Sequence, residues 1–164
     1  MDFGGKVLLD ETDHVDVAPL TSKVYLDWPL KKLTEAGAAD TSRGFVVAEV
    51  IQGGAEISRN LAYLAPVKEI HLKPALLKVE TMGAQGSYKI RITSPVLARS
   101  VYLSFGNLDV KLSDNYFDLL PGETVEITAT TVASLDDLKA QLKVISLTDA
   151  FATDGRPATV TAAK

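Results

Sequence analysis

The sequence predicts an all-β protein made of two antiparallel β-sandwiches in tandem. Runs in which apolar and polar residues alternate recur along the chain, and turn signals containing glycine or proline separate them. Helical periodicity is confined to short stretches. This rhythm is typical of antiparallel sandwiches. We expect one sandwich over residues 1–73 and a second over 74–151, with 152–164 forming a tail or a final hairpin arm.

The composition excludes several classes of function. Hydrophobic residues make up 46% and charged residues 23% of the 164 residues, as in ordinary globular domains. The net charge of −4 offers no basic patch, so we expect neither nucleic acid nor a membrane as a partner. The absence of cysteine rules out disulfides and thiolate metal sites. No apolar run could span a bilayer and the first residues do not resemble a signal peptide, which leaves the localisation unknown.

The first quarter of the chain contains two predicted strands. Residues 6–17 alternate, with an acidic break at 10–14, and residues 23–28 are strong β-formers that Pro29 ends. Residues 1–8 read as the end of one strand, a Gly-Gly turn and the start of the next. We therefore expect a piece of a larger polypeptide, whose first sandwich lacks its N-terminal strand and exposes a sheet edge.

The next stretch contains one helical turn and a hairpin. Residues 31–35 allow a single turn of helix. Residues 44–51 form an apolar strand pattern, 52–56 a glycine-containing turn and 57–64 the partner strand. Residues 67–74 are expected to be a short extended connector that holds three apolar residues and neither glycine nor serine. We therefore expect the two halves to be held rigidly together.

The second half repeats the rhythm of strands and turns. Strand patterns occupy 76–81, 87–93, 99–105, 108–112, 124–130 and 142–148. In the clearest of them, Tyr88, Ile90 and Ile92 share one face, which predicts a half-buried antiparallel strand. Ser134 is placed to cap a short helix, with Asp137 in its first turn.

Residues 113–123 are predicted to cross from one sheet to the other at a corner of the second sandwich. Pro121 and Gly122 form a turn signal at the end of this segment. If the segment is extended, Tyr116 and Phe117 point to opposite faces. One ring can then enter the core while the other caps an edge, where its hydroxyl needs a polar partner.

Two motifs in the second half resemble the C-terminal immunoglobulin-like domain of β-mannosidases of glycoside hydrolase family 2. They are LARSVYLS at 97–104 and the more specific SDNYFDLLPGE at 113–123. The first half resembles the preceding immunoglobulin-like domain of the same enzymes, through MDFGGKVL at 1–8 and ISRNLAYLAP at 57–66. The resemblance implies that both sandwiches are immunoglobulin-like.

The resemblance implies a non-catalytic accessory region of a retaining exo-glycosidase that acts on terminal β-mannosides. In such enzymes a (β/α)8 barrel carries both catalytic glutamates, so the resemblance assigns no catalytic, cofactor or metal residue to this chain. The expected partner is that barrel in a periplasmic or secreted parent enzyme, and through it terminal β-mannosides or other glycans. The alternative is a stand-alone carbohydrate-binding or cell-surface adhesion module. An upstream in-frame barrel would favour the accessory region.

The residue types that could carry chemistry have simpler explanations. A retaining glycosidase needs two carboxyl groups about 5–5.5 Å apart. The candidates by residue type lie on predicted strands or turns, where carboxylates are usually solvated or paired: Glu49, Glu56, Glu80, Glu123 and Glu126. The acidic cluster at 10–16 lacks the glycine-centred calcium loop. His14 and His71 are too far apart in the sequence to suggest zinc.

Two further groups of candidates remain open from the sequence. Asp114 and Asp118 could bind an ion beside Asn115, but Asx side chains more often hold their own turn, and we expect that role. An aromatic platform for a sugar ring could form from Trp28, Tyr25 and Tyr63. Isolated aromatic residues on strands are more often core or interdomain contacts, and we expect that here.

Overall fold

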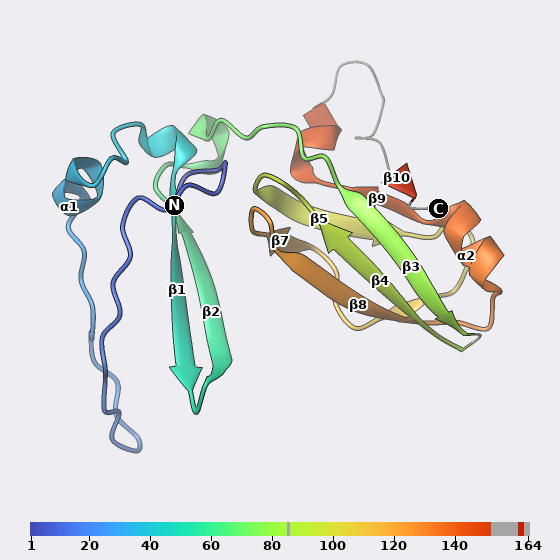
Figure 1. Ribbon diagram of the computed structural model, residues 1–164, viewed down its shortest axis with the longest axis horizontal. Coiled ribbons are helices and arrows are strands. Elements are labelled where there is room, and N and C mark those ends of the chain that lie inside the picture. Colours follow the sequence, from blue (N-terminus) through green and yellow to red (C-terminus); the bar gives the residue numbers. More distant parts are fainter. Residues whose placement is uncertain (85, 152–160, 163–164) are drawn as a thin grey trace. The chain divides into compact units, whose positions relative to one another are not determined.

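The computed structural model of the protein describes residues 1–84, 86–151 and 161–162 (Figure 1). The chain divides into two compact units, Met1–His71 and Leu72–Lys164. The described strands pair mostly antiparallel and the helices are short, which confirms the all-β prediction. The domain boundaries and the rigid junction expected from the sequence stay predictions.

The first unit contains a hairpin of two long strands, β1 (Phe45–Gln52) and β2 (Ala55–Tyr63). The strands pair antiparallel, with a shift of register after Val50. Gly53 and Gly54 form the turn with φ angles of 60° and 83°, which glycine adopts readily. The structure therefore confirms the hairpin predicted from the sequence.

Short helical segments complete the first unit. They are α1 (Leu30–Glu35) and the 3-10 turns η1 (Thr41–Arg43) and η2 (Val67–Glu69). Helix α1 confirms the predicted helical turn. The extended connector predicted from residue 67 is wrong over η2, because the Glu69 N–H donates to the Pro66 carbonyl at 2.8 Å and closes a turn.

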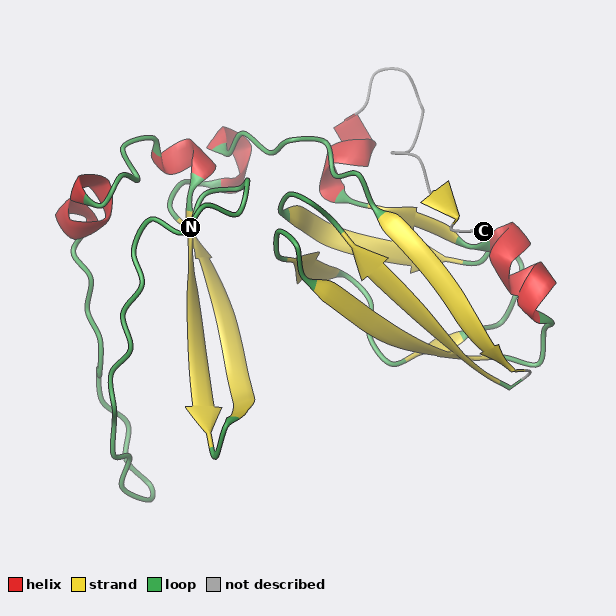
Figure 2. Ribbon diagram, viewed as in Figure 1, coloured by secondary structure: helices red, strands yellow, loops and turns green. Residues whose placement is uncertain are grey.

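The two strands predicted in the first quarter of the chain are wrong. Residues 6–17 and 23–28 are drawn as loops in Figure 2. A turn joins them, closed by the Thr21 N–H donating to the Ala18 carbonyl at 3.3 Å. A strand needs a partner for its backbone groups as well as an alternating pattern. Neither segment has a ladder partner among the described residues, and Val24 stays 80% exposed.

The second unit is a two-layer sandwich. Its strands are β3 (Lys78–Ala84), β4 (Ser87–Thr93), β5 (Ala98–Ser104), β6 (Lys111–Leu112), β7 (Phe117–Leu119), β8 (Thr124–Thr130), β9 (Lys143–Ile145) and β10 (Thr161–Ala162). One sheet has the order β10-β3-β4-β8-β6 and the other β7-β5-β9. Strand β10 pairs parallel with β3. The rest of the predicted tail or hairpin arm, 152–160 and 163–164, lies outside the described residues.

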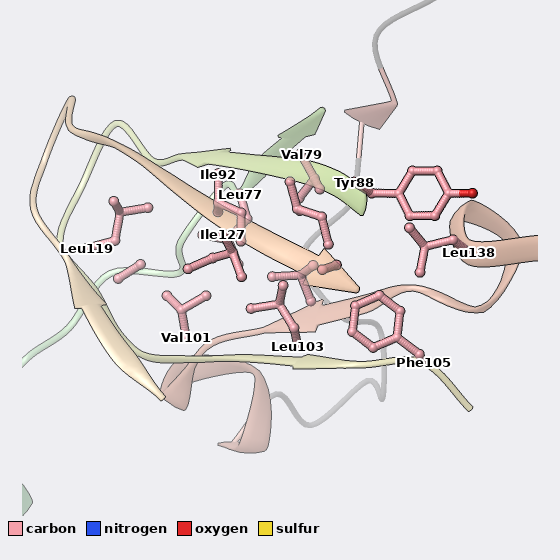
Figure 3. Close-up of a cluster of buried hydrophobic side chains, with 14 of the residues drawn as sticks. Leu77, Val79, Tyr88, Ile92, Val101, Leu103, Phe105, Leu119, Ile127 and Leu138 are labelled. Carbon is pink, nitrogen blue, oxygen red and sulfur yellow. The ribbon is translucent and has the colours of Figure 1, made fainter. Parts of the chain in front are cut away.

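The hydrophobic core of the second unit lies between these sheets (Figure 3). Tyr88, Ile90 and Ile92 on β4 are each at most 1% exposed, which confirms the alternation predicted for this strand. Strand β5 contributes Val101 and Leu103 from the other sheet. Each large apolar side chain that leaves water contributes roughly 1.5–3 kcal/mol. The second unit therefore has a core of its own.

Helix α2 (Leu135–Gln141) begins where the sequence predicts. The Ser134 hydroxyl accepts a hydrogen bond from the Asp137 N–H at 3.1 Å, so one of the unpaired donors of the first turn is satisfied. Leu138, on the inner side of the helix, is fully buried in the core. The helix therefore covers one end of the sandwich core, as Figure 3 shows.

Two predicted strands are shorter than expected. Of residues 108–112, only the last two pair as β6. Of residues 142–148, only β9 pairs with β5. The Ser146 N–H donates to the Asp149 carboxylate at 2.6 Å, which turns the chain into the 3-10 segment η3 (Leu147–Phe151). A side chain that caps a local turn therefore ends this strand early.

Candidate functional site

The segment between β6 and β7 carries the polar and aromatic residues that the sequence singles out. Strand β6 belongs to one sheet and β7 to the other, which confirms the predicted crossing. Ser113 holds the start of the segment to β8. Its N–H donates to the Thr128 carbonyl at 2.9 Å, and its hydroxyl accepts from the Thr128 N–H at 3.0 Å. The crossing thus begins from a fixed point.

Asn115 fastens the crossing segment to the C-terminal end of β5. Its side-chain oxygen accepts from the Leu103 N–H at 2.9 Å, and its side-chain nitrogen donates to the Leu103 carbonyl at 3.0 Å. The same oxygen accepts from the Tyr116 N–H at 3.1 Å. The Asp114 carboxylate accepts from the Asn115 N–H at 2.7 Å. The amide of Asn115 therefore replaces a missing backbone partner of β5.

Asp118, on β7, stabilises an irregularity in β5, the strand with which β7 pairs. Its carboxylate accepts from the Ser100 N–H at 2.7 Å. Ser100 has a φ of 50°, and the register of β5 against β7 shifts between Ala98 and Val101. The carboxylate thus pairs an N–H that the shift removes from the ladder. Asp114 therefore binds within its own turn, as expected from the sequence. Asp118 does not hold its own turn, because its carboxylate binds the backbone of the neighbouring strand β5.

Tyr116 and Tyr102 form an aromatic stack in which Tyr116 is exposed and Tyr102 half-buried. Their ring centroids lie 4.6 Å apart with the planes at 25°. The ring of Tyr116 is exposed while Phe117 packs against the core. The two rings thus separate as predicted, but Tyr116 has a φ of 64° and is not extended as that prediction assumed. Partial desolvation raises the pKa of the Tyr116 hydroxyl, and the adjacent Tyr102, with its hydrogen bond to that hydroxyl, adds to the rise. Sequence reasoning missed Tyr102, whose only signal is its outward position on an alternating strand.

The candidate carboxylates lie in ion pairs or turns. Glu49 and Glu56 both bind Arg59, at 3.1 and 2.7 Å. Glu126 binds Lys89 and Arg91 of β4. The hydrogen bond from Lys89, at 2.7 Å, is the main cause that lowers the pKa of Glu126. A general acid needs a pKa raised by burial. Glu126 has the opposite environment.

The remaining two candidates also have local partners. Lys78 contacts Glu80 at 2.8 Å, and its hydrogen bond lowers the pKa of that carboxyl. Glu123 accepts a long hydrogen bond of 3.4 Å from the Leu120 N–H in the Pro-Gly turn. Both carboxylates therefore have structural surroundings typical of the surface of a sheet.

The acidic cluster of residues 10–16 does not form a cation site. Within the described ranges, no group of three or more aspartate, glutamate or histidine side chains could hold a metal. Glu11 instead forms an ion pair with Lys32 and accepts from the Trp28 indole N–H at 2.9 Å. The hydrogen bond from Lys32 is the main cause that lowers the pKa of Glu11. The cluster is therefore a solvated segment with one organised carboxylate.

His71 belongs to a Ser-His-Asp group with the wrong order for catalysis. Its Nδ1 lies 2.9 Å from the Ser42 hydroxyl, which in turn donates to Asp40. In a hydrolase triad the histidine stands between the serine and the aspartate and takes the hydroxyl proton. Here the serine stands in the middle. The group therefore ties η1 to the end of the unit, where the His71 N–H also donates to the Ser42 carbonyl at 2.8 Å.

The three aromatic residues considered as a sugar platform have different immediate neighbours. Tyr63 lies in a cluster with Phe3 and Phe45, at centroid distances of 6.3 and 6.2 Å. The ammonium of Lys32 lies 5.2 Å from the centre of the Trp28 ring, and the ammonium of Lys23 lies over the ring of Tyr25. Tyr63 is therefore a packing residue of the first unit, while the other two rings interact with cations.

The described residues contain no helix with the length and apolarity needed to cross a membrane.

Comparisons with known proteins match both halves of the chain. A model for a mannosidase Ig/CBM-like domain matches residues 1–69, and a model for an Ig-fold domain of mannosidases matches residues 71–150. No curated protein matches the sequence. Among solved structures, the β-D-mannosidase from Dictyoglomus thermophilum is similar, with a TM-score of 0.56 and 22% identity over 66% of this chain. That similarity shows the fold alone, and the chain spans 13% of the length of that enzyme.

Proposed function

Because this chain belongs to the C-terminal immunoglobulin-like domains of glycoside hydrolase family 2 β-mannosidases, we propose that it is a non-catalytic accessory region that supports the catalytic barrel of a retaining β-mannosidase. The observation that carries the proposal is the succession of two mannosidase domain models over residues 1–69 and 71–150. Each domain is small, so surface contacts with the barrel are the means by which it would act.

The surroundings of the carboxylates favour a structural role for this chain over a catalytic one. A retaining glycosidase needs a nucleophile and an acid/base about 5–5.5 Å apart in one site. In this chain Glu49 and Glu56 share a single arginine, and Glu126 is held between two cations. Ion pairs of this kind favour the charged carboxylate and oppose its use as a proton donor. We assign both catalytic carboxylates to the barrel of the parent enzyme.

The first test is the reading frame upstream of the codon for Met1. We expect it to continue in frame into a (β/α)8 barrel with two glutamates placed for catalysis. A start codon preceded by regulatory sequence, or a signal peptide joined directly to Met1, would overturn the accessory role in favour of a stand-alone module.

The second test is the hydrolysis of p-nitrophenyl β-mannoside. We expect the purified chain to leave the substrate intact and the full-length enzyme to cleave it. In the full-length enzyme, Glu126→Gln should keep kcat within about twofold, because this carboxylate stabilises only the surface of a sheet. Cleavage by the purified chain, lost in the Glu126→Gln variant, would contradict the proposal.

A further inference from the structure

Tyr116 combines a rare backbone conformation with an exposed ring. Its φ is 64°, a region that bulky side chains seldom adopt, and its side chain is 68% exposed. Burial of the ring therefore does little to offset the backbone strain. Strain of this kind persists where the surrounding structure imposes it, and it gathers at sites that hold ligands.

Hydrogen bonds hold the backbone at Tyr116, and one aromatic neighbour contacts its ring. Asn115 binds the Tyr116 N–H and both backbone groups of Leu103. Tyr102 covers one side of the ring at 4.6 Å. On the neighbouring strand β7, Asp118 binds the backbone N–H of Ser100, another described non-glycine residue with a positive φ. The backbone beside the stack is therefore held by hydrogen bonds within the chain, and backbone that is already held loses less entropy when a partner binds.

The outer side of β5 and β9 places polar groups near this stack. Buried Val101 and Leu103 alternate along β5 with Tyr102 and Ser104, so the latter two lie on the outer side. The register sets Ser104 opposite Lys143, which is exposed. A hydroxyl and an ammonium thus lie one step along the sheet from the aromatic pair.

The outer side of the other sheet has a different character. Glu80, Arg91 and Glu126 lie in one row across β3, β4 and β8, and Arg91 pairs with Glu126 at 3.0 Å. Paired charges of this kind suit a surface that stays in water. The aromatic stack is therefore a local feature of the β5 side, not the general surface of the sandwich.

We propose that the Tyr102–Tyr116 stack is a binding site for a pyranose ring. The C–H side of the sugar lies on the exposed face of Tyr116, where weakly positive hydrogens meet the negative face of the aromatic ring. The hydroxyl of Ser104 and the ammonium of Lys143 form hydrogen bonds with the hydroxyl groups at the edge of the sugar. The choice of a sugar rests on the proposed function, because the substrates of a β-mannosidase consist of pyranose rings.

The proposal is tested by titrating the 15N-labelled chain with β-1,4-mannobiose and recording the amide resonances. We expect saturable shifts centred on Tyr102, Tyr116 and Lys143, with a Kd on the order of millimolar. Tyr116→Ala should weaken binding about tenfold or more, and Tyr116→Phe should keep it within about threefold, because the aromatic face remains. No saturable shift in the wild-type chain, or equal affinity in Tyr116→Ala, would overturn the site.

Two controls keep the test decisive. Phe151→Ala removes another exposed ring, which is 77% exposed, and should leave the affinity unchanged. Tyr116→Gly removes the ring and also permits the positive φ, so loss of binding in that folded variant cannot be ascribed to backbone damage. The upstream reading frame tests the proposed function separately. A barrel upstream together with no sugar shift overturns the site alone, and a sugar shift without that barrel overturns the accessory role alone.

Discussion

The backbone at Tyr116 is unusual, because a large side chain occupies the left-handed region at φ 64°. Such a residue costs stability that a glycine would not. We expect Tyr116→Gly to be more stable than Tyr116→Ala by roughly 0.5–1 kcal/mol, although both variants lose the stack with Tyr102. Urea unfolding followed by far-UV circular dichroism measures the difference. Equal stabilities would show that the loop relaxes when the ring is removed.

The Asn115 side chain offers a second test at the scale of one residue. It binds both backbone groups of Leu103, which lie partly buried near the C-terminal end of β5. Asn115→Ala leaves them without these partners, so we expect the free energy of unfolding to fall by about 1–3 kcal/mol. Asn107→Ala is the matched control on an exposed turn and should change it by less than about 0.5 kcal/mol. A similar loss in both variants would contradict the fastening role.

Sequence reasoning identified the local roles in this site better than the distant ones. Asp114 binds its neighbour in the chain, and such Asx bonds follow from residue type and position alone. The contact between Tyr102 and Tyr116 depends on how two strands pair across a register shift. The shift follows from the left-handed Ser100 and the bond that it makes with Asp118, which no alternation pattern reports.

The pairing of β4 with β8 makes the stability of the sandwich depend on pH. Hydrogen bonds from Lys89 and then from Arg91 lower the pKa of Glu126 from its ordinary value of 4.5. The lowered pKa means that this carboxylate contributes stability above pH 4.5, and that the contribution is lost as the pH falls through the folded pKa. We expect Glu126→Gln to flatten the acid limb of the stability curve.

The measurement is urea unfolding of the wild type and the variant at several pH values between neutral and strongly acidic. Lys89→Gln removes the hydrogen bond that lowers the pKa of Glu126 most. It should flatten the same limb to a smaller extent, because Arg91 remains at 3.0 Å from Glu126. Parallel curves for all three proteins would mean that exposure to solvent cancels the effect of these pairs.

Elements were predictable where pattern and partner lie close together in the chain. The hairpin of β1 and β2 and the central strand β4 were predicted, because a short turn brings each to its neighbour. Residues 6–17 and 23–28 also have strand patterns, the first with an acidic break, and yet form no ladder among the described residues. A pattern shows that a segment can be a strand, but a strand exists only where a backbone partner is present.

At the scale of the whole molecule, the two units differ in how much core they possess. The second unit buries a continuous cluster that includes Ile90, Leu103 and Ile127. In the described first unit, the buried apolar side chains are Phe3, Ala38 and Phe45. We expect amide hydrogen exchange to be slow in β4, β5 and β8 and much faster throughout the first unit. Equal protection in both units would contradict this difference.

A core substitution separates the units further. Leu103→Ala deletes a side chain that is 2% exposed, and should lower the free energy of unfolding of the second unit by about 2–5 kcal/mol. The exchange rates of β1 and β2 serve as the internal control and should stay unchanged. Faster exchange in that hairpin would show that the two units unfold together.

Residues 6–28 belong to no sheet, and this determines where a protease first cuts the described part of the chain. A protease cleft binds its substrate in extended form, and exposed chain without a ladder needs little unfolding to enter it. Lys23 lies exposed next to the turn that joins the two segments. Brief digestion with trypsin should therefore give a first nick after Lys23, seen by mass spectrometry, while the sheets of the second unit stay intact. A first nick within β4 would mean that the apparent openness of the early segment is lost in solution.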